Sequence, residues 1–289
     1  MDQTLWFHRA PSGWEPSDPN PFTPDGTYDR GWSCFRLLDR EGETLFTGRA
    51  PNGLFVAAAE RRVPDLAWRV CDFIRYERGQ GRQVILDGPK EADCVEMIRR
   101  AWESTVDERA IRANDPPVVV HSTPREAWPA IERDSMLKST ARLRAEGCVS
   151  TPLPVETSEV AQYQDGEPAE YADHIMFGQP GNPVVECIIV SKQRGSFCLD
   201  ADARYTPGVR LYFDLHAIIR DGLGVRDGLH LVKVRDHLPL ARYLLGVVGV
   251  EDIHSDRPGE EWTPRLFTEE ADRTFQQRWR PSGRHGGNT

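Results

Sequence analysis

The hydrophobic positions after residue 117 fall in short apolar runs separated by turn residues. Such runs, rich in β-branched and aromatic residues and bounded by Gly, Pro, Asn or Asp, are typical of β-strands. We expect strands at VVVHST (118–123), HIMFG (174–178), VVECIIVS (184–191), GVRLYFD (208–214), HLVKV (230–234) and YLLGVVGV (243–250). Strands in quick succession with few helices predict an antiparallel or mixed sheet rather than a doubly wound parallel one.

Helical spacing dominates an earlier part of the chain. Between residues 63 and 78, Leu66, Val70 and Ile74 recur at the interval of one helix face, which predicts a helix. QVILDGP (83–89) then predicts a strand and a turn, and EADCVEMIRRAWES (91–104) predicts a second helix. This part of the chain therefore reads as a small α+β unit.

A further helix is expected directly after the VVVHST run. Pro124 suits the first turn of a helix, with Thr123 as its N-cap. One face of that helix would then carry apolar side chains, namely Ala127, Trp128, Ile131 and Met136. This pattern predicts a helix that runs to about Ser135.

Helix-breaking residues and the local composition predict two domains and a tail. Consecutive prolines in IRANDPP stop a helix and hold the next residues extended, so a boundary is expected there. We expect a small α+β domain at 1–114, a second domain at 118–279 and a flexible tail at 280–289. Residues 146–170 are rich in Pro, Ser, Thr, Gln and Glu, so they are expected to form an exposed loop, either a lid over a site or a plain surface connection.

Composition narrows the class of protein. Of the 289 residues, 39% are hydrophobic and 28% are charged, as in folded globular proteins. No membrane span or secretory signal is expected, which favours a cytoplasmic protein. The cysteines do not form a Cys-x-x-Cys pair, which favours reduced thiols over a zinc site or disulfide bonds. The formal charge of −9 disfavours general adhesion to a polyanion but allows a nucleic acid in a local basic cleft.

The commonest catalytic signatures are missing. The sequence has no Gly-x-x-x-x-Gly-Lys-Ser/Thr, no Gly-x-Gly-x-x-Gly after a strand, no His-Glu-x-x-His and no Gly-x-Ser-x-Gly. DGLGVRDG (221–228) is rich in glycine but lacks the strand and helix that flank a phosphate loop, so it predicts a hairpin turn.

The chain resembles the ADP-ribosyltransferase fold, above all RNA 2′-phosphotransferases and DNA-modifying toxins of related fold. Three elements carry the resemblance. The first is a strand that ends in His121, Ser122 and Thr123 and leads into a helix, and the second is a strand with another histidine, His174 in YADHIMFG. The third is PVVECIIVSKQRGSF, after which comes YTPGVRLYFD. It covers about 118–250 and implies an α+β fold with a split mixed sheet. The family usually has Gly where Ser135 stands, and its basic N-terminal lobe is not recognisable in 1–114.

The resemblance also implies a site for NAD as substrate. His121 would hydrogen-bond the ribose, and Ser122 and Thr123 would line the same pocket. The nicotinamide would lie against Tyr212, and the phosphates would be held by Lys138, Arg142 and Arg210. The catalytic residues would be His121, His174 and a late glutamate, for which Glu251 is the first candidate and Glu260 and Glu261 are others.

The implied activity is transfer of ADP-ribose, or of a 2′-phosphate, to a nucleic-acid or protein acceptor. Each residue also has a purely structural interpretation, since a histidine at a strand end is often a polar cap and Tyr212 is by default a core residue.

An alternative function belongs to a different class of protein. The charge, the eight tryptophans and the lack of a complete catalytic signature fit a non-enzymatic acidic binding protein, such as an antitoxin, immunity or phage-related factor with a basic protein partner.

Overall fold

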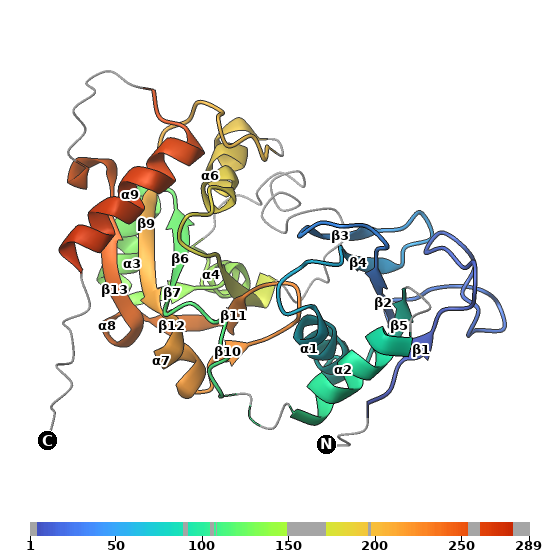
Figure 1. Ribbon diagram of the computed structural model, residues 1–289. Helices are drawn as coiled ribbons and strands as arrows, with labels where there is room; N and C mark the ends of the chain where they lie inside the picture. Colours follow the sequence, from blue (N-terminus) through green and yellow to red (C-terminus); the bar gives the residue numbers. More distant parts are fainter. Residues whose placement is uncertain are drawn as a thin grey trace, which may run out of the picture.

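The computed structural model describes residues 5–88, 92–104, 107, 109–148, 172–195, 198–253 and 261–279. Helices and strands are mixed in both halves of the chain, so the fold is of the α+β class. Figure 1 shows two lobes, which we name the first lobe (residues 5–104) and the second lobe (residues 118–279). In the described part of the chain, no helix combines the length and the apolar character needed to cross a membrane.

The first lobe is built on a five-stranded sheet with the order β1-β5-β2-β4-β3. The neighbours β1–β5, β5–β2 and β2–β4 are parallel, and only β3 runs antiparallel to its neighbour. The strands are β1 His8–Arg9, β2 Trp32–Leu37, β3 Leu45–Arg49, β4 Phe55–Ala59 and β5 Gln83–Asp87.

Helix α1 (Leu66–Gly79) and helix α2 (Ala92–Ser104) cover one face of this sheet. Val70, Phe73, Ile74 and Glu77 of α1 are buried at the spacing of one helix face, as the periodicity of the segment predicts. The opposite face of the sheet is covered by the chain around Trp14, which packs on Cys34, Leu54 and Ile85.

The second lobe contains two three-stranded sheets, β13-β9-β6 and β10-β11-β8, and a two-stranded ladder, β12-β7. All of these pairings are antiparallel. The strands are β6 Val118–Thr123, β7 Met136–Lys138, β8 His174–Phe177, β9 Val209–Asp214, β10 Gly224–Val225, β11 Val232–Arg235, β12 His237–Pro239 and β13 Leu244–Val248. The strands expected near residues 118, 174, 208, 230 and 243 are confirmed.

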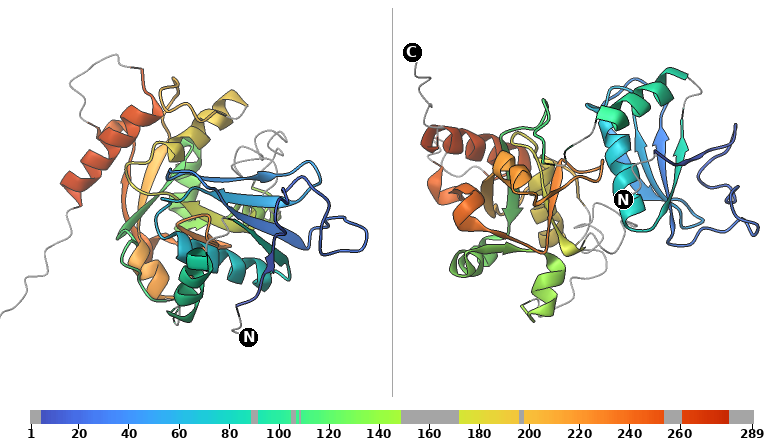
Figure 2. Two further views of the ribbon diagram at one scale, coloured as in Figure 1. Left: turned by 45° about the vertical axis from the view of Figure 1, so that its right-hand side comes forward. Right: turned by 90° about the horizontal axis from the view of Figure 1, so that it is seen from below.

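Both faces of the β13-β9-β6 sheet are covered (Figures 1 and 2). One face packs against α6 (Val184–Arg194) and α9 (Pro264–Arg278), while the other meets the second sheet across a core that includes Val119, Leu211 and Phe213. The remaining helical segments are η1 Arg125–Ala127, α3 Trp128–Asp134, α4 Thr140–Ala145, α7 Leu215–Arg220, α8 Leu240–Tyr243 and η3 Val250–Asp252.

One expected strand is a helix. VVECIIVS belongs to α6, where Val185, Glu186, Ile189 and Val190 are buried at helical spacing. The helix follows Pro183 and ends at Gly195, which adopts the left-handed conformation with φ 64°. The expectation was wrong because a short β-branched run does not by itself distinguish a strand from a buried helix.

The helix after β6 also begins later than expected. Thr123 is still paired with Val209 in the sheet, and Pro124 is extended, with φ −54° and ψ 143°. Thr123 is therefore not an N-cap, and the chain passes through the short turn η1 before α3 begins at Trp128. The expected end of the helix is confirmed, because Ser135 terminates α3 in the left-handed region with φ 49°.

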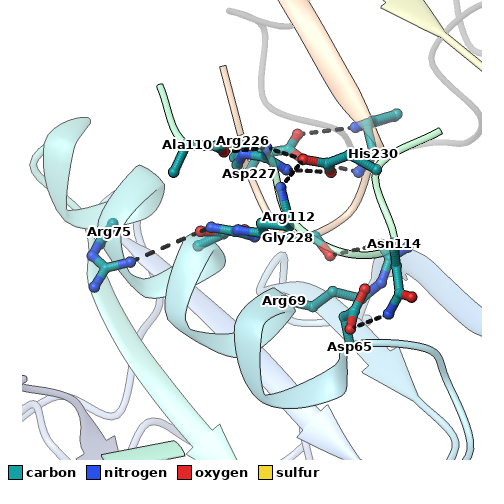
Figure 3. Close-up of polar contacts among 12 residues, drawn as sticks. Asp65, Arg69, Arg75, Ala110, Arg112, Asn114, Arg226, Asp227, Gly228 and His230 are labelled. Carbon is teal, nitrogen blue, oxygen red and sulfur yellow. Dashed lines mark hydrogen bonds and ion pairs between the residues drawn. The ribbon is translucent and has the colours of Figure 1, made fainter. Parts of the chain in front are cut away.

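Buried charges join the two lobes. Arg69 of α1 donates to the carbonyl oxygens of Gly228 and Leu229 at 3.2 and 3.3 Å (Figure 3). Asp227 and Lys233 are fully buried and form an ion pair at 2.9 Å, and the ammonium of Lys233 lies 3.7 Å from the ring centre of Tyr76. Because each buried charge needs its partner, this interface fixes the position of β11 against α1.

Candidate functional site

The end of β6 carries a histidine in a defined orientation. Nδ1 of His121 lies 3.1 Å from the carbonyl oxygen of Met176 on β8, and the ring meets that of Phe177 edge-on, with 6.1 Å between the ring centres. A carbonyl oxygen can only accept, so Nδ1 carries the proton. The neutral ring then presents Nε2 as a hydrogen-bond acceptor.

The charge state of His121 follows from its surroundings. Burial lowers the pKa of His121 to about 4, the hydrogen bond to Met176 partly opposes this, and the positive charge of Lys192 lowers the pKa further. The imidazole is therefore neutral at physiological pH. A neutral imidazole cannot attract a phosphate by charge, but it can accept a hydrogen bond from a hydroxyl group.

The strands β6 and β8 meet at a single point. Val120 and Gly178 exchange two backbone hydrogen bonds of 2.9 Å in an isolated bridge. On both sides of Val120 β6 pairs with β9, while β8 pairs with β11 up to Phe177, the residue before Gly178. A side chain at residue 178 would overlap Val185, so glycine is needed for α6 to approach this junction. His121 thus lies one residue beyond the point where the two sheets join.

Lys192 is a site residue that sequence reasoning missed. It lies half-buried in the last turn of α6, and burial lowers its pKa while the charge of Glu126 in η1 opposes that change. The positive charge of Lys192 is also one of the causes that lower the pKa of His121, after burial. The signal for it is the helical spacing from Val185 through Ile189 to Lys192, which was interpreted as a strand.

The late glutamate Glu251 also reaches this end of the strand. It lies in η3 and forms an ion pair of 2.9 Å with Arg125, the first residue of η1. Both side chains are exposed. Residues far apart in sequence therefore gather at the carboxyl end of β6, and we name His121, Arg125, Glu126, Lys192 and Glu251 the β6-end cluster.

Ser122, Arg210 and Tyr212 lie on the opposite face of the sheet from His121. Successive residues of a strand point to opposite faces, and Arg210 is paired with Ser122 in the register. Arg210 has no exposed surface and bonds Glu186 at 3.0 Å and Asp272 at 3.0 Å. The arrangement does not bring these residues together with His121.

The buried residues Ser122, Arg210 and Tyr212 connect the sheet to α6 and α9. Ser122 donates to Glu186, and the hydroxyl of Tyr212 donates to Asp272 at 2.7 Å. The ring of Tyr212 stacks on Phe275 with 3.9 Å between the ring centres. Burial opposes the charge of Arg210, but Glu186 and Asp272 together raise its pKa, so it stays protonated. These contacts stabilise the packing of the helices.

The other predicted residues are distributed over the lobe. Thr123 is buried beside Val209, and His174 begins β8 with its ring 6.4 Å from that of Tyr76 at the lobe interface. Lys138 bonds Asp134 at 2.8 Å and Glu146 at 2.6 Å.

Arg142 bonds Glu146 at 2.5 Å and Asp236 at 2.9 Å, so it shares a carboxylate partner with Lys138. Glu261 forms a surface ion pair with Arg204 at 2.8 Å. Glu260 and most of the loop expected at 146–170 lie outside the described residues.

Comparison with known proteins finds no matching family model, no similar curated protein and no similar solved structure. Within the described residues, no group of three or more His, Cys, Asp or Glu side chains is arranged to hold a metal ion. The geometry of the β6-end cluster is therefore the basis for a functional proposal.

Proposed function

We propose that the second lobe is an NAD-dependent transferase that moves ADP-ribose, or a 2′-phosphate, to a nucleic-acid or protein acceptor. The observation that carries the proposal is the orientation of His121, whose Nδ1–H is held by the Met176 carbonyl while Nε2 is left as an acceptor. An acceptor at the junction of two sheets suits a ribose hydroxyl, which is the role that the family resemblance implies for this histidine.

Two further features support the resemblance. The position at which the related family usually has glycine is Ser135, and this residue adopts the left-handed conformation that glycine favours. In addition, Glu251, the first candidate for the late glutamate, lies at the same end of β6 as His121 through its contact with Arg125.

The proposed chemistry assigns roles to three residues of the β6-end cluster. As nicotinamide leaves, the bond from the ribose anomeric carbon to the nicotinamide nitrogen breaks and a bond to the acceptor oxygen forms, so positive charge develops on the ribose. His121 orients the ribose through Nε2, Lys192 stabilises the phosphates, and the carboxylate of Glu251 takes the proton from the acceptor hydroxyl.

Calorimetric titration with NAD tests the proposal. His121→Ala is expected to weaken NAD binding by roughly fivefold or more, because a hydrogen bond with correct geometry is lost. His216→Ala is the matched control, since His216 is also a half-buried histidine bonded to a backbone carbonyl, that of Asp115 at 3.2 Å. The control is expected to bind NAD as the unmodified protein does.

Two results would reject the proposal. NAD binding of equal strength in both variants would remove His121 from the site, and failure to bind any nucleotide would remove the transferase class. If a basic protein partner were then recovered in stoichiometric amount, with no turnover of labelled NAD, the chain would instead be a non-enzymatic acidic binding protein.

A further inference from the structure

The first lobe carries a long loop with a fixed conformation. Residues 10–31 contain no helix or strand, and in Figure 2 this loop projects from the lobe on the side away from the second lobe. Loops of this length without secondary structure are uncommon in compact domains and are usually functional when they are ordered.

Two asparagine side chains hold the loop in shape. Asn20 is 2% exposed, donates to the carbonyl oxygen of Thr27 at 3.1 Å and accepts from the backbone N–H of Phe22 at 3.0 Å. Asn52, from the turn before β4, donates to the carbonyl oxygens of Pro16 and Asp18 at 2.8 and 2.9 Å. The surface that the loop presents is therefore preorganised, which lowers the entropy cost of binding.

The loop encloses a shallow depression with an aromatic wall and an acidic rim. Its lining residues are Thr23, Pro24, Asp25, Thr27, Asp29 and Trp32. The indole of Trp32 is held by Phe22, which stacks on it at 6.0 Å, and by Tyr28, which meets it edge-on at 6.5 Å. The wall is thus a rigid aromatic group rather than a mobile side chain.

The carboxylates of the rim have negative charge that no cation neutralises within the described residues. Asp25 accepts from the backbone and hydroxyl of Thr27, and Asp29 accepts from the N–H of Gly31. The hydroxyl of Thr27 is the main reason that the pKa of Asp25 is lowered, so this carboxylate is charged at neutral pH. Glu15, in the same loop, differs in this respect because it forms an ion pair with Arg36.

We propose that this depression binds the guanidinium or ammonium group of a side chain on a basic peptide segment of a protein partner. A cation beside an indole is attracted by the π electrons, and carboxylates at the rim supply the opposite charge. The depression is open and lies on a projecting loop, which suits a side chain presented by a partner. This site is separate from the β6-end cluster, so the proposal does not depend on the proposed transferase activity.

Fluorescence anisotropy with a labelled synthetic Gly-Arg repeat peptide tests the proposal. The peptide is expected to bind, and a peptide with citrulline in place of arginine, which has the same shape without the charge, is expected to bind at least roughly fivefold more weakly. Binding should also weaken as the salt concentration rises. Trp32→Phe should reduce the affinity by roughly twofold to fivefold, because phenylalanine attracts a cation less than tryptophan does.

A pair of double variants separates the site from the overall charge of the protein. Asp25→Asn with Asp29→Asn removes both charges and keeps one oxygen at each position, which can still accept from the backbone N–H of Thr27 and of Gly31. A loss of roughly fivefold or more in affinity is therefore expected. Glu43→Gln with Glu132→Gln removes the same charge from exposed residues outside the depression and should leave the affinity unchanged.

Three outcomes would overturn the proposal. Equal losses in the two double variants would mean that the peptide responds only to net charge, and equal binding of the citrulline peptide would mean that no cation is recognised. The third is an NMR titration in which the indole N–H signal of Trp32, assigned by its loss in Trp32→Phe, does not move when the arginine peptide is added.

Discussion

At the scale of single residues, His121 determines how the stability of the second lobe should depend on pH. The folded protein holds the pKa of His121 at about 4, mainly through burial. In the unfolded chain the pKa of a histidine is roughly 6.5. Between these values the unfolded chain binds a proton that the folded protein does not bind, so stability is full above about pH 6.5 and falls as the pH decreases towards 4.

Thermal unfolding of His121→Gln tests this linkage. The unmodified protein is expected to lose more of its melting temperature between pH 7 and 5 than the variant does, because glutamine has no proton to gain and its amide can still donate to the Met176 carbonyl. Parallel pH profiles for the two proteins would mean that folding does not lower the pKa of His121.

At the scale of elements, α9 depends on the residue before its first turn. The hydroxyl of Thr263 accepts from the backbone N–H of Leu266 at 3.3 Å, and Pro264 occupies the first helical position. Phe267, Ala271 and Phe275 of this helix are buried against the β13-β9-β6 sheet. The start of α9 therefore contributes to the packing that holds Tyr212 and Arg210.

Substitution of Thr263 measures that contribution. Thr263→Ala is expected to lower the free energy of unfolding by about 1 kcal/mol, since one backbone N–H of the first turn loses its acceptor. Thr263→Ser retains the hydroxyl and should restore most of the stability in urea titrations. An equal loss in both variants would attribute the effect to the methyl group of Thr263 and not to capping.

At the scale of the whole molecule, Gly228 allows the two lobes to approach closely. It has a positive φ of 77°, and a Cβ atom at this position would overlap the carbonyl oxygen of Arg69 in α1. Arg69 in turn donates to the carbonyl oxygen of Gly228 (Figure 3). Only glycine allows the backbones of the two lobes to meet in this way.

Gly228→Ala should therefore weaken the packing of the two lobes against each other. Gly53→Ala is the matched control, because Gly53 also has a positive φ, 87°, but has open space where the Cβ would lie. The control is expected to cost about 1 kcal/mol for the left-handed conformation alone. Gly228→Ala should cost more in urea titrations and should enlarge the radius of gyration in solution scattering. Equal effects of the two variants would mean that the interface adjusts without strain.

The α+β class and most of the strands could be predicted from local patterns in the sequence. The runs that became β6, β8, β9, β11 and β13 have the alternation and turn residues that fit a pleated, partly buried strand, and these properties are local. The helical spacing in α1 is equally local, because the same apolar face is repeated over its whole length. In addition, the sequence placed Ser135 at the end of a helix, where it closes α3.

The helical conformation of α6 and the composition of the site depend instead on contacts between distant parts of the chain. VVECIIVS is apolar enough for either a strand or a buried helix, and the choice came from packing of α6 on β6, which buries Val185 and Ile189. The position of Arg210 and Tyr212 depends on which face of β9 each side chain occupies, and the register with β6 fixes this. A register is a relation between distant segments, so no local pattern around Arg210 could show that it lies away from His121.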